Sequence, residues 1–154
     1  MHRLILCLAL LLLPVLQPAA GVLIQSAHSR FYEEGEIRPV SQYFGSSLAE
    51  QRFRTVIPSD PENPSGQYFI LRLEREGGPE PALARISLFS SNSKDMRRHE
   101  WSLAGKPLKG WLYLGLTGVD WSSGEVSPMA WRIELLDTEG TLLAEWKSFL
   151  WEMP

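Results

Sequence analysis

Cysteine and histidine are scarce in this chain. Its 154 residues include one cysteine, Cys7, which lies in an apolar run close to the N-terminus. A disulfide framework within the chain is therefore excluded, and so are zinc sites built on pairs of cysteines. The two histidines beyond that run, His28 and His99, are distant in sequence, and no His-x-x-His or Asp-x-Asp run accompanies them. We therefore expect neither a metal site nor a cofactor.

An excess of charge of one sign is also missing. The chain has 15 Lys and Arg against 18 Asp and Glu, interspersed along its length, so no broad basic field favours a nucleic-acid partner. The densest basic cluster, Lys94–His99, is diluted by acids and is interpreted as a solvated loop. No Gly-x-Ser-x-Gly nucleophile elbow and no glycine-rich phosphate loop occurs. We expect a protein that is not an enzyme.

A long apolar run occurs only at the N-terminus. A basic start, the apolar run Leu4–Leu13 and the small residues Ala19-Ala20-Gly21 are the three parts of a secretory signal peptide. A membrane span requires ~20 apolar residues, and Pro14 and Gln17-Pro18 interrupt this run too early. The sequence predicts a signal peptide over residues 1–21, with cleavage after Gly21 favoured and cleavage after Ala20 as the alternative frame.

The expected mature chain, residues 22–154, has the size of one domain. It has 133 residues and no cysteine, and its 14 Lys and Arg against 18 acids give a formal charge of −4. A length of ~100–150 residues is the commonest for a domain that buries its own core. Export without disulfides favours a bacterial periplasm or the cell exterior over disulfide-rich secretion. We expect a secreted or periplasmic protein with no stable membrane span after cleavage.

The clearest structural pattern lies near the C-terminus. Apolar and polar residues alternate over 131–135 and again over 142–147, which is typical of strands with one dry face. Asp137 and Gly140 bracket a type I turn between them, so the two segments form a hairpin. Its predicted inward face consists of Trp131, Ile133 and Leu135 on the first strand and Leu142, Ala144 and Trp146 on the second.

The fold class is predicted from seven to nine short strands that Gly and Pro residues separate. No segment has a helical pattern of sufficient length. The segments are 22–32, 40–44, 52–57, 67–75, 82–89, 100–103, 111–116 and the terminal hairpin, with a single helical turn at 47–50. They predict an all-β domain, a single antiparallel two-sheet β-sandwich. In strand count and size it resembles immunoglobulin-like and fibronectin type III sandwiches, although the cysteine pair that marks true immunoglobulin domains is absent.

The loop 117–125 combines two carboxylates, an aromatic residue and glycines, and three interpretations remain open for it. Asp120 and Glu125 would be the acid and base of a small secreted glycoside hydrolase. Alternatively, Trp121 would stack on a sugar with Trp101 or Trp111, while Asp120 binds its hydroxyls, as in a carbohydrate-binding module. The third interpretation is a purely structural loop.

Phe149, Leu150 and Trp151 are consecutive and bulky, so the alternation of the last strand fails there. A bulge near Ser148 would turn this run inward. Otherwise one of its faces is left for a partner. The leading hypothesis is therefore an exported, non-catalytic binding or adaptor domain that contacts another protein in the cell envelope through an edge strand or through Phe149–Trp151. A polysaccharide is the alternative partner.

Overall fold

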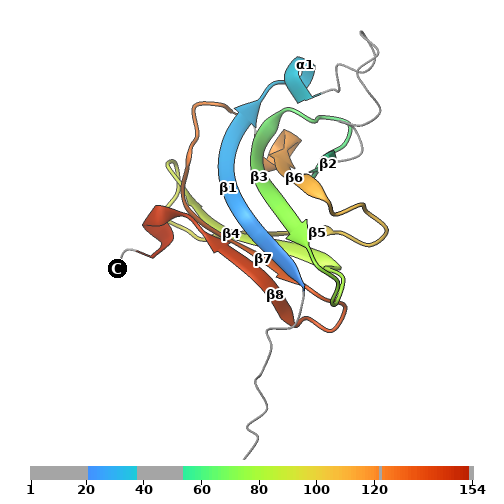
Figure 1. Ribbon diagram of the computed structural model, residues 1–154. Coiled ribbons are helices and arrows are strands. Elements are labelled where there is room, and N and C mark those ends of the chain that lie inside the picture. Colours follow the sequence, from blue (N-terminus) through green and yellow to red (C-terminus); the bar gives the residue numbers. More distant parts are fainter. Residues whose placement is uncertain (1–20, 38–53, 122, 153–154) are drawn as a thin grey trace, which may run out of the picture.

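A computed structural model describes residues 21–37, 54–121 and 123–152. These residues form two four-stranded sheets that pack face to face (Figure 1). The strands are β1 (Val22–Tyr32), β2 (Arg54–Pro58), β3 (Gly66–Arg75), β4 (Leu83–Ser90), β5 (Arg97–Ser102), β6 (Gly110–Thr117), β7 (Pro128–Leu136) and β8 (Leu142–Lys147). Three short helical turns accompany them: α1 (Glu34–Ile37), η2 (Gly118–Asp120) and η3 (Phe149–Trp151).

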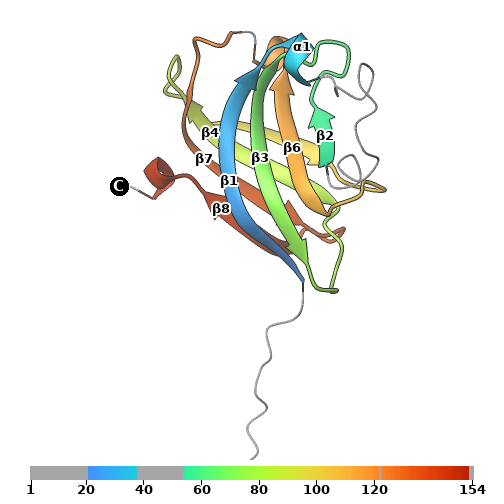
Figure 2. The same cartoon turned by 45° about the horizontal axis from the view of Figure 1, so that its top comes forward.

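The two sheets have the orders β1-β3-β6-β2 and β5-β4-β7-β8. Figure 2 shows the strands of the first sheet side by side, in front of the strands of the second sheet. The prediction of an all-β chain built as two sheets is confirmed, and the eight strands of the described residues fall within the expected seven to nine. The predicted strand at 40–44, the helical turn at 47–50 and the signal peptide up to residue 20 lie outside the described residues.

One pair of strands corrects the expectation of a wholly antiparallel sandwich. β2 runs parallel to β6, with Arg54 opposite Trp111 and Pro58 opposite Gly115. The other five pairings are antiparallel. Hairpin signals specify only the direction of strands that follow each other in the chain, whereas a parallel pair is joined through a long crossover. Here β3, β4 and β5 intervene between β2 and β6, so no local pattern revealed their relative direction.

The predicted turn between β7 and β8 is confirmed. The Asp137 carboxylate accepts hydrogen bonds from the N–H groups of Glu139 (2.9 Å) and Thr141 (2.8 Å). Gly140 has a φ of 82°, which a residue with a side chain rarely adopts, and its N–H donates to the Asp137 carbonyl oxygen at 3.2 Å. The turn is therefore closed by the two residues that the sequence marks for it.

A β-bulge follows this turn and corrects the predicted face of β8. Leu135 pairs with Ala144 but Leu136 pairs with Leu142, so Leu143 is an extra residue on the second strand. Leu142 is consequently 48% exposed, and Leu143 packs against the core in its place. Beyond the bulge the predicted alternation holds, since Ala144 and Trp146 both pack against the core.

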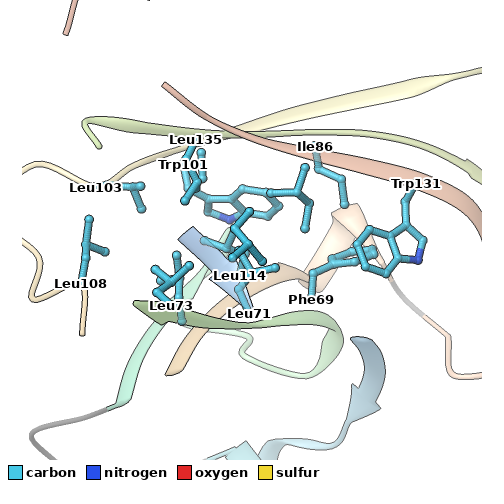
Figure 3. Close-up of a cluster of buried hydrophobic side chains, with 14 of the residues drawn as sticks. Phe69, Leu71, Leu73, Ile86, Trp101, Leu103, Leu108, Leu114, Trp131 and Leu135 are labelled. Carbon is cyan, nitrogen blue, oxygen red and sulfur yellow. The ribbon is translucent and has the colours of Figure 1, made fainter. Parts of the chain in front are cut away.

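The core lies between the two sheets and is closed by aromatic residues from both of them. Figure 3 shows Trp101 and Trp131 among aliphatic side chains of the core. The Trp131 ring meets the Phe69 ring edge-on, with 5.3 Å between their centres. A second, smaller cluster covers the outer face of the first sheet, where Ile37 of α1 packs on Tyr68 and Ile70. Both faces of β3 are therefore buried at its beginning.

Candidate functional site

The loop after β6 is fastened to the loop after β2 through Thr117. This buried side chain accepts a hydrogen bond from the Asp60 N–H (2.8 Å) and donates one to the Asp60 carbonyl oxygen (3.1 Å). Its own N–H donates to the Ser59 hydroxyl at 2.9 Å. Gly118 follows with a φ of 58°, and a Cβ atom there would meet the Asp60 carboxylate. Asp120 and Trp121 are therefore presented by a fixed loop.

Asp120 and Trp121 meet Arg97 of β5 at a shallow hollow. The Arg97 guanidinium donates a hydrogen bond to the Asp120 carbonyl oxygen (2.6 Å) and lies 5.6 Å from the centre of the Trp121 ring. The hollow has a volume of about 230 Å³, and Asn92, Val119 and Val126 complete its lining among the described residues. Arg97 thus belongs to the support of this loop, not to a freely solvated basic segment as the sequence suggested.

This hollow offers little for catalysis. Asp120 is the single acid that lines it within residues 21–37, 54–121 and 123–152, and Glu125 is exposed outside that lining. A glycoside hydrolase needs two carboxyl groups that face each other across the substrate. In the same described residues, no group of three or more His, Cys, Asp or Glu side chains is placed to hold a metal ion.

The three tryptophans of the carbohydrate hypothesis are not brought together. Trp101 and Trp121 are each only 3% exposed, so neither presents a ring face to a sugar. Trp101 lies in the core and donates from its ring N–H to the Gly115 carbonyl oxygen at 3.3 Å. Trp111 lies on the outer face of the first sheet and is 37% exposed. Trp111 is next to the first residue of β6 and Trp121 follows the end of that strand, so a length of strand of about 20 Å, at ~3.3 Å per residue, lies between them.

The C-terminal turn, Phe149–Trp151, begins where β8 stops pairing with β7. The Ser148 N–H donates to the Trp131 carbonyl oxygen (2.8 Å), and the Trp131 N–H donates to the Ser148 hydroxyl (2.9 Å). The chain then enters the 3₁₀ turn η3, which packs against β7. The predicted bulge that would turn all three residues inward does not form, because the side chain of Ser148 replaces the next backbone partner and the strand ends.

The three residues of this turn have different environments. The Trp151 ring lies 6.0 Å from the Phe89 ring, and the Arg132 guanidinium lies 5.3 Å from the Trp151 ring centre. Phe149 is 82% exposed and Leu150 44% exposed. Trp151 therefore anchors the turn on the outer side of β4 and β7, while its two neighbours face solvent.

The sequence did not predict the residues that support the hollow at Trp121 and the C-terminal turn. The alternation in β7 placed Arg132 on the wet face, but it did not show that a C-terminal tryptophan returns to cover that arginine. The contact of Arg97 with Trp121 joins residues 24 positions apart on different elements. A bulky residue just past the end of a hairpin strand was the available signal for Trp151, since such a residue must cover its own strand or its neighbour.

Two groups have shifted pKa values, and both stabilise loops and strands outside the hollow and the turn. The Asn63 side chain and the N–H groups of Glu62 and Asn63 donate to the Asp60 carboxylate and hold its pKa below the usual value. Burial raises the pKa of the Tyr68 phenol to about 12. Neither shift prepares a group for acid–base chemistry at neutral pH.

Comparison with known proteins gives no further guide to this arrangement. No protein-family model matches the chain, and no curated protein or solved structure shows significant similarity to it. Among the described residues, no helix is both long and apolar enough to cross a membrane. A function for the chain therefore has to be argued from the chemistry of its described surface.

Proposed function

We propose that the chain is an exported, non-catalytic β-sandwich that binds another protein through the C-terminal turn. One observation carries this proposal: Phe149 is 82% exposed on a turn whose base is held by two hydrogen bonds between Ser148 and Trp131. Aromatic residues are enriched at protein interfaces, and an anchor that is already ordered loses little conformational entropy on binding.

The turn is a better contact than the free edge of the neighbouring strand. β8 is the edge strand of its sheet, and its Glu145 and Lys147 side chains form an ion pair of 3.2 Å. Charged side chains on an edge strand oppose pairing with a further strand. Leu150, which is 44% exposed, extends the apolar surface of Phe149 without such charges. The partner surface is therefore proposed to be an apolar pocket and not a strand edge.

Export is part of this proposal. β1 begins at Val22, directly after the predicted signal peptide, so removal of residues 1–21 would leave every described strand complete. A location in the periplasm or outside the cell is consistent with a mature chain that contains no cysteine. Purification of the mature chain and determination of its N-terminal residue tests this part independently of any binding experiment.

We further propose that the sandwich is of the immunoglobulin-like type. In such domains the strands in chain order are called A to G, with A, B, E and D in one sheet and G, F and C, often extended by C′, in the other. If β1, β3 and β6 correspond to A, B and E, then β5-β4-β7-β8 corresponds to C′-C-F-G. β2 would then occupy the place of D beside E, but it runs parallel to its neighbour and precedes B in the chain.

Site-specific photo-crosslinking in the cells that export the chain tests the protein contact. A photoreactive amino acid at position 149 should give a discrete crosslinked band with a partner. The matched control is position 119, since Val119 is 94% exposed on a different loop. The crosslink should weaken at least tenfold when Leu150→Ser removes the adjoining apolar surface. Equal crosslinking at both positions, or none at position 149, would contradict the proposal.

A further inference from the structure

A second exposed aromatic residue, Trp111, lies in the middle of an unusual row on the outer face of the first sheet. Strand register places Arg72 of β3 opposite Trp111 on one side and Arg54 of β2 opposite it on the other. Residues paired across neighbouring strands project from the same face of a sheet. The row Arg72–Trp111–Arg54 therefore crosses three strands, with the tryptophan on the strand between those of the two arginines.

Among the described residues, no acid forms an ion pair with either arginine of this row. Other arginines do form ion pairs, namely Arg30 with Glu36, Arg75 with Glu80, Arg85 with Glu100 and Arg132 with Glu134. Instead, the Arg72 guanidinium lies 5.8 Å from the Trp111 ring centre, and the Arg54 guanidinium lies 4.3 Å from that of Tyr113. Aromatic faces orient both cations without neutralising them.

Among the described residues, the row lies at the surface. Arg72 is exposed and Arg54 is half-buried. Glu74, the acid nearest to Arg72 along β3, accepts a hydrogen bond from the side chain of Gln25 on β1. The exposed His28 stands edge-on to Trp111, with 6.5 Å between the ring centres. The Arg72 guanidinium thus lies by Trp111, and the Arg54 guanidinium lies by Tyr113, two residues further along the same face of β6.

We propose that the row Arg72–Trp111–Arg54 binds an acidic sugar residue of a polysaccharide. An indole face is a flat apolar surface on which the C–H groups of a sugar ring pack. A guanidinium group binds a carboxylate or sulfate oxygen pair through two parallel N–H donors. Two strand spacings of ~4.8 Å place the backbones of the two arginines about 10 Å apart, centred on the tryptophan. Of the three tryptophans considered for sugar binding, this site uses Trp111 alone. Arginines take the place of the other two.

Single-stranded nucleic acid combines flat rings with anions too, but the chain suits it less well. Proteins that bind it without sequence preference follow its backbone along a positively charged groove over several nucleotides. Here the row has two guanidinium groups without an ion pair among the described residues, one by Trp111 and one by Tyr113, and the chain has a formal charge of −3. A saccharide with scattered acidic groups matches this limited charge better than a continuous polyphosphate does.

Affinity electrophoresis of the full mature chain tests the proposal with defined polymers. Gels containing polygalacturonate or dextran sulfate should retard the protein, whereas neutral dextran should not. The two acidic gels distinguish carboxylate from sulfate as the preferred group. Fluorescence anisotropy with oligo(dT) provides the nucleic-acid comparison. Equal retardation by neutral dextran, tighter binding of oligo(dT), or no retardation by either acidic polymer would overturn the proposal.

Substitutions assign any binding to the row. Trp111→Ala and Arg72→Ala should each weaken the retardation at least tenfold, while Arg72→Lys should retain part of it. Arg98→Ala, an exposed arginine of β5, and Phe149→Ala, the other exposed aromatic, should leave it unchanged. Retardation that survives both row substitutions would contradict the assignment. Because Phe149 belongs to the proposed protein contact, failure of one proposal leaves the other intact.

Discussion

Tyr68 illustrates how the outer face of the first sheet accommodates a buried phenol. Its ring covers Gly115, where an added Cβ atom would lie 2.5 Å from the ring. Its hydroxyl donates to the Pro64 carbonyl oxygen at 2.8 Å. Glycine at position 115 is thus required by the close approach of the ring and not by an unusual backbone conformation. The neutral phenol keeps its hydrogen bond, whereas burial disfavours the ionised form by more than the Arg54 charge favours it.

The raised pKa of Tyr68 predicts how stability changes at alkaline pH. The folded pKa is about 12, above the unfolded value of ~10, so the stabilisation by the neutral phenol is complete below pH ~10 and is lost as pH rises toward 12. An ultraviolet absorbance titration should show one late-ionising tyrosine, which Tyr68→Phe removes. The free energy of unfolding, measured in urea, should fall more steeply between pH ~10 and ~12 for the wild type than for Tyr68→Phe. Ionisation of all tyrosines near pH ~10 would contradict this account.

Substitution of Trp101, another single residue, tests the packing of the core between the two sheets. Replacement by phenylalanine removes the hydrogen bond to the Gly115 carbonyl oxygen and leaves part of the indole volume empty. We expect a loss of about 2–3 kcal/mol in the free energy of unfolding, measured by urea denaturation. The control Trp111→Phe should lose less than about 1 kcal/mol, since that ring is partly exposed. Equal losses for the two variants would show that Trp101 is not in the core.

At the scale of elements, Ser148 decides where β8 ends and the C-terminal turn begins. Ser148→Ala removes the hydroxyl that accepts the Trp131 N–H, so we expect a loss of about 1 kcal/mol in the free energy of unfolding. Hydrogen–deuterium exchange should accelerate in residues 149–152 while β3 and β6 keep their protection. Ser102→Ala, at the exposed end of β5, serves as the control. Unchanged exchange in the turn would mean that packing of Trp151 alone holds it.

Sequence patterns predicted the elements whose determinants are local. Alternation located β3, β4 and both strands of the final hairpin, and Asp137 with Gly140 identified the turn, because each depends on residues close together in the chain. The parallel pairing of β2 with β6 depends on strands separated by β3, β4 and β5. The bulge at Leu143 depends on how β7 and β8 align after the turn. Local alternation specifies neither feature.

The same difference between local and long-range determinants applies to the candidate sites. The consecutive apolar residues at 149–151 marked where the alternation of the last strand fails, but they predicted neither the 3₁₀ turn nor its anchor, Trp151. The row Arg72–Trp111–Arg54 could not be predicted, since its members come from three strands and meet only through lateral register. The burial of Trp121 agrees with the structural interpretation of its loop, whereas its contact with Arg97 of the other sheet could not be predicted. Residues in a loop sequence resemble a ligand site whether they face solvent or the core.

At the scale of the whole molecule, the chain separates a closed aromatic core from two exposed aromatic surfaces. The core lies between the sheets (Figure 3), the C-terminal turn extends the second sheet, and Trp111 stands on the outer face of the first. Both proposed contacts therefore use surfaces that fixed strands support, and neither needs a deep cleft.

Fluorine NMR of the chain labelled with fluorotryptophan tests this separation most directly. Each of the six tryptophans gives one signal, assigned by single Trp→Phe substitutions, and a paramagnetic agent dissolved in the solvent broadens the accessible ones. The signals of Trp101, Trp121 and Trp131 should stay sharp while that of Trp111 broadens strongly. Broadening of Trp101 or Trp121 to the same extent as Trp111 would contradict the account, because the tryptophans assigned to the core would then be open to solvent and to ligands.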